Sequence, residues 1–374
     1  MTVKNNAVAG AVKTSHKEPL FHLVKRTDIA TWKKWLIRVV AVVIALLIAG
    51  IVCAALTGGK NFVKFYSELF SGSLGTVWRL QVMLQAWAIL MCISLAVTPA
   101  FKMRFWNIGA EGQTLISALA AVVCIIYFGG KIPEPALIMT MLAFSVVAGA
   151  IWAVIPAIFK AFWGTNETLF TLMMNYVATQ LVLYAVNIWA KDGSGTLGVL
   201  SHGSFDKLFG MEYIQNVVFV TLLTVIVFVY LKFFKHGYEL EVVGESVNTA
   251  KYIGINVKKV IIRTMVFSGV MCGLAGFLLV GGSPSPTVNA NLVGGRGFTA
   301  ILVSWLSKFS PIAMIFVTLL VVFLERGATQ AANTMRLGDS GAFVDIVVGL
   351  FFLLIIACEF FLNYKIKFRK KEGK

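Results

Sequence analysis

Long uninterrupted apolar runs recur along the chain, and they constrain its fold more than any other feature of the sequence. A run of about 18 or more apolar residues is long enough to cross a lipid bilayer as a helix. The runs lack the two-residue alternation that a membrane β-barrel requires. We therefore predict an all-α polytopic membrane protein with about ten transmembrane helices, at residues 36–56, 78–100, 110–129, 136–158, 168–189, 215–234, 263–281, 297–307, 311–325 and 343–362.

The composition agrees with this class and excludes others. Hydrophobic residues make up 58% of the 374 residues and charged residues 13%, whereas soluble domains average about 45–50% and about 25%. A soluble enzyme, a nucleic-acid module, a disordered chain and a disulfide scaffold are thereby excluded. The five cysteines lie inside apolar runs without C-x-x-C spacing, so we interpret them as packing residues. The four histidines have no metal-ligand spacing, and no metal site is predicted.

The net charge of +16 carries information about topology. Lys and Arg are frequent in the two terminal segments, residues 1–35 and 363–374, and in the loop at 235–262. Because basic segments remain on the cytoplasmic side, we expect both termini to be cytoplasmic, which requires an even number of crossings. We interpret the basic excess as topology and contact with anionic membrane lipids, and we expect no nucleic-acid partner.

The sequence divides into three parts: a cytoplasmic basic tail at 1–35, a transmembrane domain at 36–362 and a second basic tail at 363–374. The first span is long enough to remain in the membrane as an uncleaved anchor. Before it, Leu20, Phe21, Val24, Trp32 and Trp35 recur at near-helical spacing. Such spacing predicts either an interfacial helix or, because the segment is otherwise polar, disorder.

Polar residues inside apolar helices are costly, so they are the most informative side chains of this sequence. In two spans they fall on one helical face. The third span carries Asn107, Glu111, Thr114 and Ser117, with Gln113 beside them, and the fifth carries Glu167, Thr171, Asn175 and Thr179, with Asn166 and Gln180 at the margins. Two facing stripes would line a hydrophilic substrate path. Bonds between helices explain the same residues, and a carboxylate at a helix N-terminus, as Glu111 or Glu167, is favourable as a cap.

Two further segments have a structural signature. Gly269, Cys272, Gly273 and Gly276 give the seventh span a small-residue face, which predicts close helix packing. In the loop at 235–262, Ser246 is a good N-cap and Gly254 a good residue for the turn after a helix, and they frame a helix of about seven residues. A capped helix that projects from a membrane domain predicts a docking surface, with an ordered connector as the alternative.

No sequence motif for ATP binding is present. The chain has no G-x-x-x-x-G-K-[ST], and the segment from Gly295 to Ala300 resembles a dinucleotide fingerprint only in its glycines, because no βαβ strand precedes it. We therefore expect a protein that is not an enzyme and holds no cofactor of its own.

Three stretches together resemble a known family: Asn107 to Ser117, Gly164 to Ala178 and Val243 to Ile255. They are similar to the permease subunits of bacterial ABC importers, and within these to the ribose and nucleoside branch. The resemblance runs from about Leu80 to Tyr364 in the same order. The motifs Asn-Ile-Gly-Ala-Glu-Gly-Gln, Asn-Glu and Met-Asn-Tyr are more similar to nucleoside-type permeases than to simple-sugar ones.

The resemblance implies a type II-like importer permease in the bacterial inner membrane. Its implied partners are two ABC ATPases that use the ATP, a second permease subunit, identical or not, and an extracytoplasmic solute-binding lipoprotein. It also implies that Gly244, Glu245, Ala250 and Gly254 couple the permease to the ATPase. Thr299 and the run from Ser304 to Lys308 depart from the family pattern, which leaves the substrate open between nucleosides and simple sugars.

The residues leave other transport classes open as well. A secondary transporter or channel would also have polar stripes, but the sequence shows no inverted repeat and no interior carboxylate pair suited to ion coupling. A membrane-embedded enzyme would need a constellation of His, Asp or Ser in the spans, and we find none.

Overall fold

The computed structural model describes residues 21–25, 30–59, 61–190, 195–208 and 210–368. These residues form helices α1 to α13 and one two-stranded sheet. The chain divides into two compact units, a smaller one from residues 1–49 and 350–374 and a larger one from Gly50–Gly349. Nine of the described helices are long and apolar enough to cross a membrane. They match nine of the ten spans expected from hydropathy.

The smaller unit joins the two ends of the chain. Strand β1 (Phe21–Lys25) pairs antiparallel with β2 (Tyr364–Phe368), with Leu23 opposite Ile366. This strand corrects the interfacial helix considered for the first tail, because backbone pairing with a distant segment overrides local helical spacing. Leu20 lies outside the described residues, and Trp32 and Trp35 belong to helix α1 (Thr31–Leu56). Arg38 of α1 and Glu359 of α13 (Ser340–Asn363) approach within 3.8 Å.

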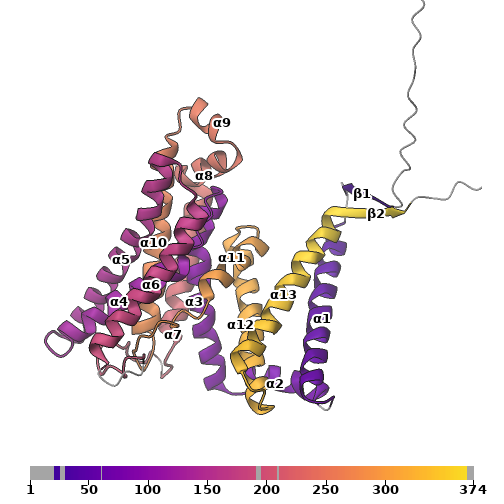
Figure 1. Cartoon of the computed structure of the whole chain (residues 1–374), viewed down its shortest axis with the longest axis horizontal. Helices are drawn as coiled ribbons and strands as arrows, with labels where there is room; N and C mark the ends of the chain where they lie inside the picture. The colour runs from indigo at the N-terminus through magenta and orange to yellow at the C-terminus, as the bar shows by residue number, and fades with distance from the viewer. Residues whose placement is uncertain (1–20, 26–29, 60, 191–194, 209, 369–374) are drawn as a thin grey trace, which may run out of the picture. The chain divides into compact units, whose positions relative to one another are not determined.

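The larger unit is a helical bundle with a short helical element at one end (Figure 1). Its elements are α2 (Phe62–Leu74), α3 (Val77–Lys102), α4 (Ala110–Phe128), α5 (Glu134–Trp163), α6 (Glu167–Trp189), α7 (Ile214–Phe233), α8 (Lys235–Glu245), α9 (Val247–Tyr252), α10 (Val257–Gly281), α11 (Arg296–Leu306) and α12 (Pro311–Thr334), followed by the first part of α13. The short helices α8 and α9 project from the end of the bundle at which α7 ends and α10 begins.

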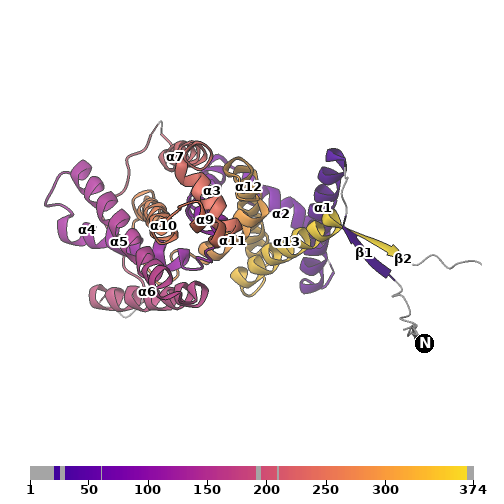
Figure 2. The same cartoon turned by 90° about the horizontal axis from the view of Figure 1, so that it is seen from above.

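Helix α10 packs at the centre of the bundle against α3, α4 and α5 (Figure 2). Its small-residue face makes this packing possible. A Cβ added at Gly269 would lie 2.4 Å from the Gly149 carbonyl oxygen of α5, and one at Gly276 would lie 2.7 Å from the Ala118 amide nitrogen of α4. The close packing predicted from this glycine face is therefore confirmed. All five cysteines are buried, in agreement with their interpretation as packing residues.

The eighth predicted span, residues 297–307, is not a full crossing. Helix α11 has 11 residues, which gives a length of about 16 Å, roughly half of a bilayer's hydrocarbon core. The chain leaves α10 beside the start of α7, where Phe205 bonds Gly281 and Asn216 contacts Gly282. It begins α12 beside the end of α7, where Pro311 shares a pocket with Leu231 and Lys232. Residues 282–310 therefore run the length of the bundle as an irregular segment followed by a half-length helix.

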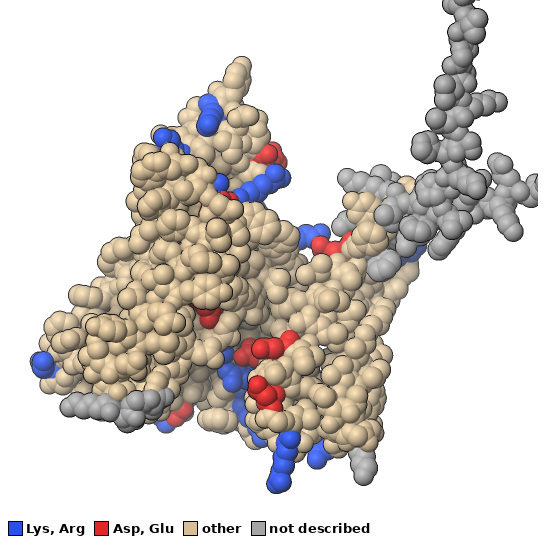
Figure 3. Space-filling model, viewed as in Figure 1, with Lys and Arg blue, Asp and Glu red and all other residues tan. Residues whose placement is uncertain are grey.

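Charged side chains gather toward the ends of the larger unit, with few between them (Figure 3). Lys and Arg are visible around α8 and α9. The broad uncharged surface between the ends is what a lipid bilayer requires of a helical bundle.

Candidate functional site

The link between α3 and α4 leaves backbone groups at the start of α4 that the helix itself cannot satisfy. Asn107 is fully buried and satisfies one of these groups, because its Oδ1 accepts a hydrogen bond from the Gly109 amide at 3.1 Å. Its side chain also exchanges bonds with Gln113 at 3.1 and 3.4 Å and donates to Ser268 Oγ on α10 at 3.2 Å. Asn107 and Gln113 therefore tie the junction to the central helix.

Two predicted residues of α6 bond the same junction from the other side. The Ile108 amide donates to Thr171 Oγ1 at 3.2 Å, and Asn175 Nδ2 donates to the Ile108 carbonyl oxygen at 2.9 Å. Asn175 Oδ1 also accepts from the Gly112 amide at 2.9 Å. An added Cβ on Gly112 would lie 2.8 Å from that oxygen, so glycine is required for this approach. Thr171 and Asn175 of the α6 stripe thus bond the backbone of the junction, at residues next to Asn107 and Glu111.

Glu111 binds a different helix. Its carboxylate accepts from the Gly295 amide at 2.8 Å and from the Gly297 amide at 2.7 Å, at the N-terminus of α11. A carboxylate at this position satisfies unpaired amide groups and interacts favourably with the helix dipole. Glu111 is therefore a cap, but of α11 rather than of the helix to which it belongs. Gly297 allows the approach, because a Cβ there would lie 2.5 Å from the Glu111 amide nitrogen.

The start of α11 lies well inside the bundle. Gly112, next to Glu111, bonds Asn175, which is eight residues, or about 12 Å, along α6 from Glu167. Beside this helix start is a cavity of about 480 Å³, which we call the polar pocket. It is lined by Asn291, Gly294, Gly295, Thr299, Glu325, Thr329, Ser340, Gly341, Val344 and Asp345. Arg296 approaches Glu325 at 3.4 Å at this level.

The structure places Asn166 and Glu167 apart from the junction, at the first turn of α6. Asn166 is the N-cap, and its Oδ1 accepts from the Leu169 amide at 3.2 Å. The Glu167 carboxylate pairs with Lys160 of α5 at 2.7 Å. Of the seven predicted path residues, five therefore meet near the start of α4 and two lie at the end of the bundle. Their role in a substrate path stays a prediction.

The second candidate site is the projecting element formed by α8 and α9. The framed helix predicted between Ser246 and Gly254 is confirmed as α9: Ser246 Oγ accepts from the Thr249 amide at 3.2 Å, and Gly254 has φ +84°. Gly244 lies against α3, where an added Cβ would be 2.3 Å from the Lys102 carbonyl oxygen. Glu241 binds the Lys102 ammonium at 2.5 Å. The element is therefore fixed to the bundle at its α8 half.

The four predicted coupling residues differ in their surroundings. Glu245 is exposed and Gly244 is buried. Ala250 is fully buried within this chain, so it supports α9 from inside and does not offer a contact to a partner. The exposed apolar side chains of α9 and the turn after it are Val247, Tyr252 and Ile253, and Tyr252 is 92% exposed.

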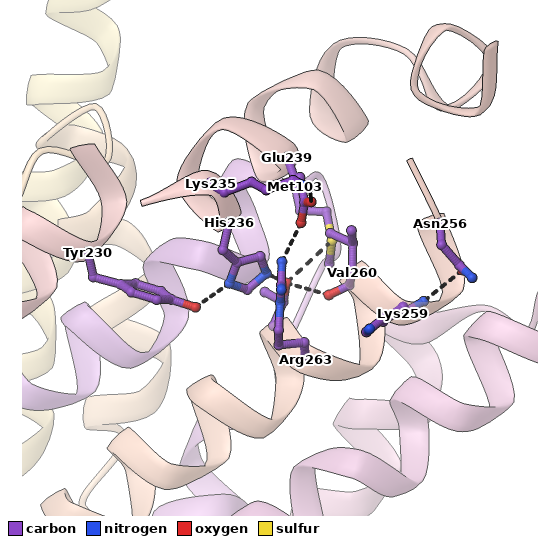
Figure 4. Close-up of polar contacts among 10 residues, drawn as sticks. Met103, Tyr230, Lys235, His236, Glu239, Asn256, Lys259, Val260 and Arg263 are labelled. Atoms are coloured by element: carbon purple, nitrogen blue, oxygen red, sulfur yellow. Dashed lines mark hydrogen bonds and ion pairs between the residues drawn. The ribbon is translucent and has the colours of Figure 1, made fainter. Parts of the chain in front are cut away.

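A buried histidine connects this element to the helices of the bundle (Figure 4). His236, 4% exposed, bonds Tyr230 of α7 through Nδ1 and Thr264 of α10 through Nε2 at 3.1 Å. Thr264 in turn contacts the sulfur of Met103 at the α3–α4 junction. Sequence analysis missed this role because the partners of His236 lie on other helices. The one local signal is the His236–Gly237 pair after an apolar span.

The protonation of His236 follows from its surroundings. Burial, together with the nearby Arg263 guanidinium, lowers its pKa to about 4, and Glu239 opposes this shift. The imidazole is therefore neutral near pH 7, and one ring nitrogen donates while the other accepts. Arg263 and Glu239 form an ion pair beside it, between α10 and α8.

The comparisons with known proteins agree with this architecture. Residues 79–356 match the family model described as branched-chain amino acid transport system, permease component. The chain belongs to this permease family. The family assignment predicted from the three sequence motifs is thereby confirmed.

Similar proteins also match over most of their length. The guanosine ABC transporter permease NupP of Bacillus subtilis is 26% identical over 90% of this chain and 97% of its own. The nucleoside ABC transporter permease NupB of Lactococcus lactis is 28% identical, over 80% and 85%. The glucose ABC transporter permease TsgB13 of Haloferax volcanii is 28% identical, over 91% and 92%. The permease therefore has relatives named for nucleosides and for a sugar.

Proposed function

We propose that this permease is the membrane subunit of an ATP-driven importer that takes up nucleosides. In this proposal two ABC ATPases bind its cytoplasmic face, a second permease subunit completes the membrane part, and an extracytoplasmic binding lipoprotein delivers the solute. Both termini and the α8–α9 element lie in the cytoplasm, in accordance with the basic residues in these segments.

The observation that carries the coupling proposal is the exposed apolar tip of a firmly held element. Tyr252, Ile253 and Val247 are exposed at an end of the bundle that carries many charges. Exposed apolar groups within a polar surface mark a protein contact, and tyrosine is frequent among residues that dominate binding energy. Because Gly244, Glu241 and His236 fix α8 to three helices of the bundle, a force applied at α9 reaches the α3–α4 junction.

Truncation of the tip tests this proposal. Tyr252→Ala should weaken association with the ATPase at least tenfold, since a well-packed interface tyrosine contributes about 2 kcal/mol. Tyr127→Ala is the matched control, because Tyr127 is also exposed but lies at the C-terminal end of α4, the end of that helix away from the α3–α4 junction. Pull-down of the ATPase with the purified permease measures both. If the two variants bind the ATPase equally well, α9 does not dock on the ATPase.

The choice of nucleosides over sugars rests on the relatives and on the motifs near Asn107 and Asn175. It is tested by uptake in cells that express the whole transporter, with radiolabelled guanosine and unlabelled competitors. We expect nucleosides to compete and glucose, fructose and ribose not to compete at the same concentration. Competition by a sugar alone would reassign the permease to the simple-sugar branch.

A further inference from the structure

A second cavity, lined largely by aromatic rings, lies at the end of α11 farthest from the polar pocket. It has a volume of about 380 Å³, and we call it the aromatic pocket. It is lined by Phe101, Lys102, Arg104, Trp106, Trp305, Lys308 and Phe309. Ligand sites for small molecules have about this volume and are mostly apolar, with a few polar groups at the rim.

The aromatic rings form a connected wall. The ring centroids of Trp106 and Trp305 are 5.3 Å apart, and Phe101 lies 5.7 Å from the first and 6.5 Å from the second. Phe101 is buried, but Trp106 is 43% exposed and Trp305 is 50% exposed. Each tryptophan therefore keeps a large accessible ring surface, although the wall behind it is packed.

Bonds of the larger unit hold this wall in place. Thr98 and Ser304 join α3 to α11 through their hydroxyl groups at 2.9 Å, one residue before Trp305. The Trp106 carbonyl oxygen accepts from Thr171 at 3.4 Å. Tryptophans are also frequent at membrane interfaces, where they anchor helices. Here two of them, from elements far apart in sequence, are fixed on one cavity.

The backbone around the pocket is unusual. Arg104, Lys308 and Phe309 have φ of +59°, +51° and +59°. Such left-handed conformations are uncommon for residues other than glycine and cluster at functional sites. Arg104 and Lys308 each follow the last turn of a helix, where glycine is the usual residue. Basic residues there interact favourably with the negative ends of the α3 and α11 dipoles.

The aromatic pocket is connected through α11 to the polar pocket and through Lys102 to α8. Phe298, Leu302 and Trp305 form an exposed stripe on α11 that runs from the polar pocket to the aromatic pocket. Lys102, at the rim, is bound by Glu241 of α8. A planar ring that passes along α11 thus reaches the pocket next to the element to which we assign ATPase coupling.

We infer that the aromatic pocket binds the base of a nucleoside on the cytoplasmic side of the permease, as an exit site before release. This inference rests on the proposed function for its orientation and substrate class. Stacking on aromatic rings recognises any nucleobase by the flat face of its ring. Because the exit site faces the cytoplasm in this proposal, a solute should reach it without the binding protein.

Photolabelling of the intact permease–ATPase complex tests the exit site. The probe is 8-azidoguanosine, and labelled peptides are identified by mass spectrometry without the binding protein present. We expect labelling in the peptides that contain Trp106 and Trp305, protection by guanosine and no protection by ribose. Trp305→Ala should reduce labelling about tenfold, from the loss of one stacking surface, while Trp305→Phe should keep most of it.

Trp78→Ala is the control, because Trp78 is exposed at the start of α3, at the other end of that helix. Trp106→Ala repeats the test if Trp305→Ala does not assemble. Labelling only elsewhere, equal protection by ribose or no labelling because a partner covers the pocket would each overturn the inference. Guanosine uptake in cells separates the two proposals. Labelling without uptake would contradict nucleoside import but would keep the aromatic pocket as a site that binds the base. Uptake without labelling would contradict the exit site alone.

Discussion

Removal of the Glu111 carboxylate should release the start of α11. In Glu111→Ala the amides of Gly295 and Gly297 lose acceptors at 2.8 and 2.7 Å. Hydrogen bonds to a charged group contribute about 1.5–3 kcal/mol each, and the energy regained by not burying a carboxylate offsets part of the loss. We therefore expect a net loss of about 2–4 kcal/mol in the local stability of α11. Glu111→Gln keeps one acceptor and should lose about half as much.

Hydrogen exchange of the purified complex measures this effect directly. A local loss of about 2–4 kcal/mol accelerates the exchange of α11 amides by roughly 30-fold or more. Glu167→Gln is the matched control, because its carboxylate pairs with Lys160 of α5 near the end of the bundle, away from α11. If α11 amides in Glu111→Ala stay as protected as in the wild type, the carboxylate does not hold this helix.

Three further changes test other parts of the structure. Gly244→Val should lower the thermal unfolding temperature of the complex, because the new Cβ would lie 2.3 Å from the Lys102 carbonyl oxygen. Such overpacking costs about 1–3 kcal/mol. Gly338→Ala is the control and should leave that temperature unchanged, because Gly338 has open space around it. His236 has a pKa of about 4 in the folded protein and near 6.5 in the unfolded chain. The free energy of unfolding should therefore fall by at most about 3 kcal/mol as the pH drops from about 6.5 to about 4. If a His236→Gln variant keeps the same pH dependence, His236 is not the group responsible. Asn175→Leu should insert normally but reduce uptake, because the Gly112 amide and the Ile108 carbonyl oxygen lose their partner. Normal uptake would show that Asn175 serves helix packing and not transport.

Features that depend on local sequence were predictable. Nine spans follow from hydropathy because a bilayer imposes the same length and apolar character on every crossing helix. The ends of α9 follow from Ser246 and Gly254, since capping depends on residues within one turn of the helix end. The close packing of α10 follows from glycines at small-residue spacing.

Features that depend on distant partners were not predictable. The start of α11 is set by Glu111, 184 residues away from Gly295, so an apolar run alone suggested a full span. The pairing of β1 with β2 joins the two ends of the sequence and replaces the helical spacing seen near Phe21. His236 appeared isolated because its partners Tyr230 and Thr264 are recognisable only once α7, α8 and α10 are assembled.

The spacing of the polar stripes gave a correct grouping but left the function open. Thr171 and Asn175 both reach the α3–α4 junction, because residues four apart share a helical face. Their bonds to backbone at the start of α4 could not be foreseen, since hydropathy does not show where a helix is interrupted. A substrate path along these residues remains a prediction for the uptake assay of Asn175→Leu.

The energy source of uptake tests the central claim most directly. The permease, its ATPase and its binding protein are reconstituted in proteoliposomes, and accumulation of radiolabelled guanosine is measured with either enclosed ATP or an imposed ion gradient. We predict accumulation that requires ATP and the ATPase and continues when ionophores abolish all gradients. Accumulation driven by a sodium or proton gradient without ATP would contradict the account and identify a secondary transporter instead.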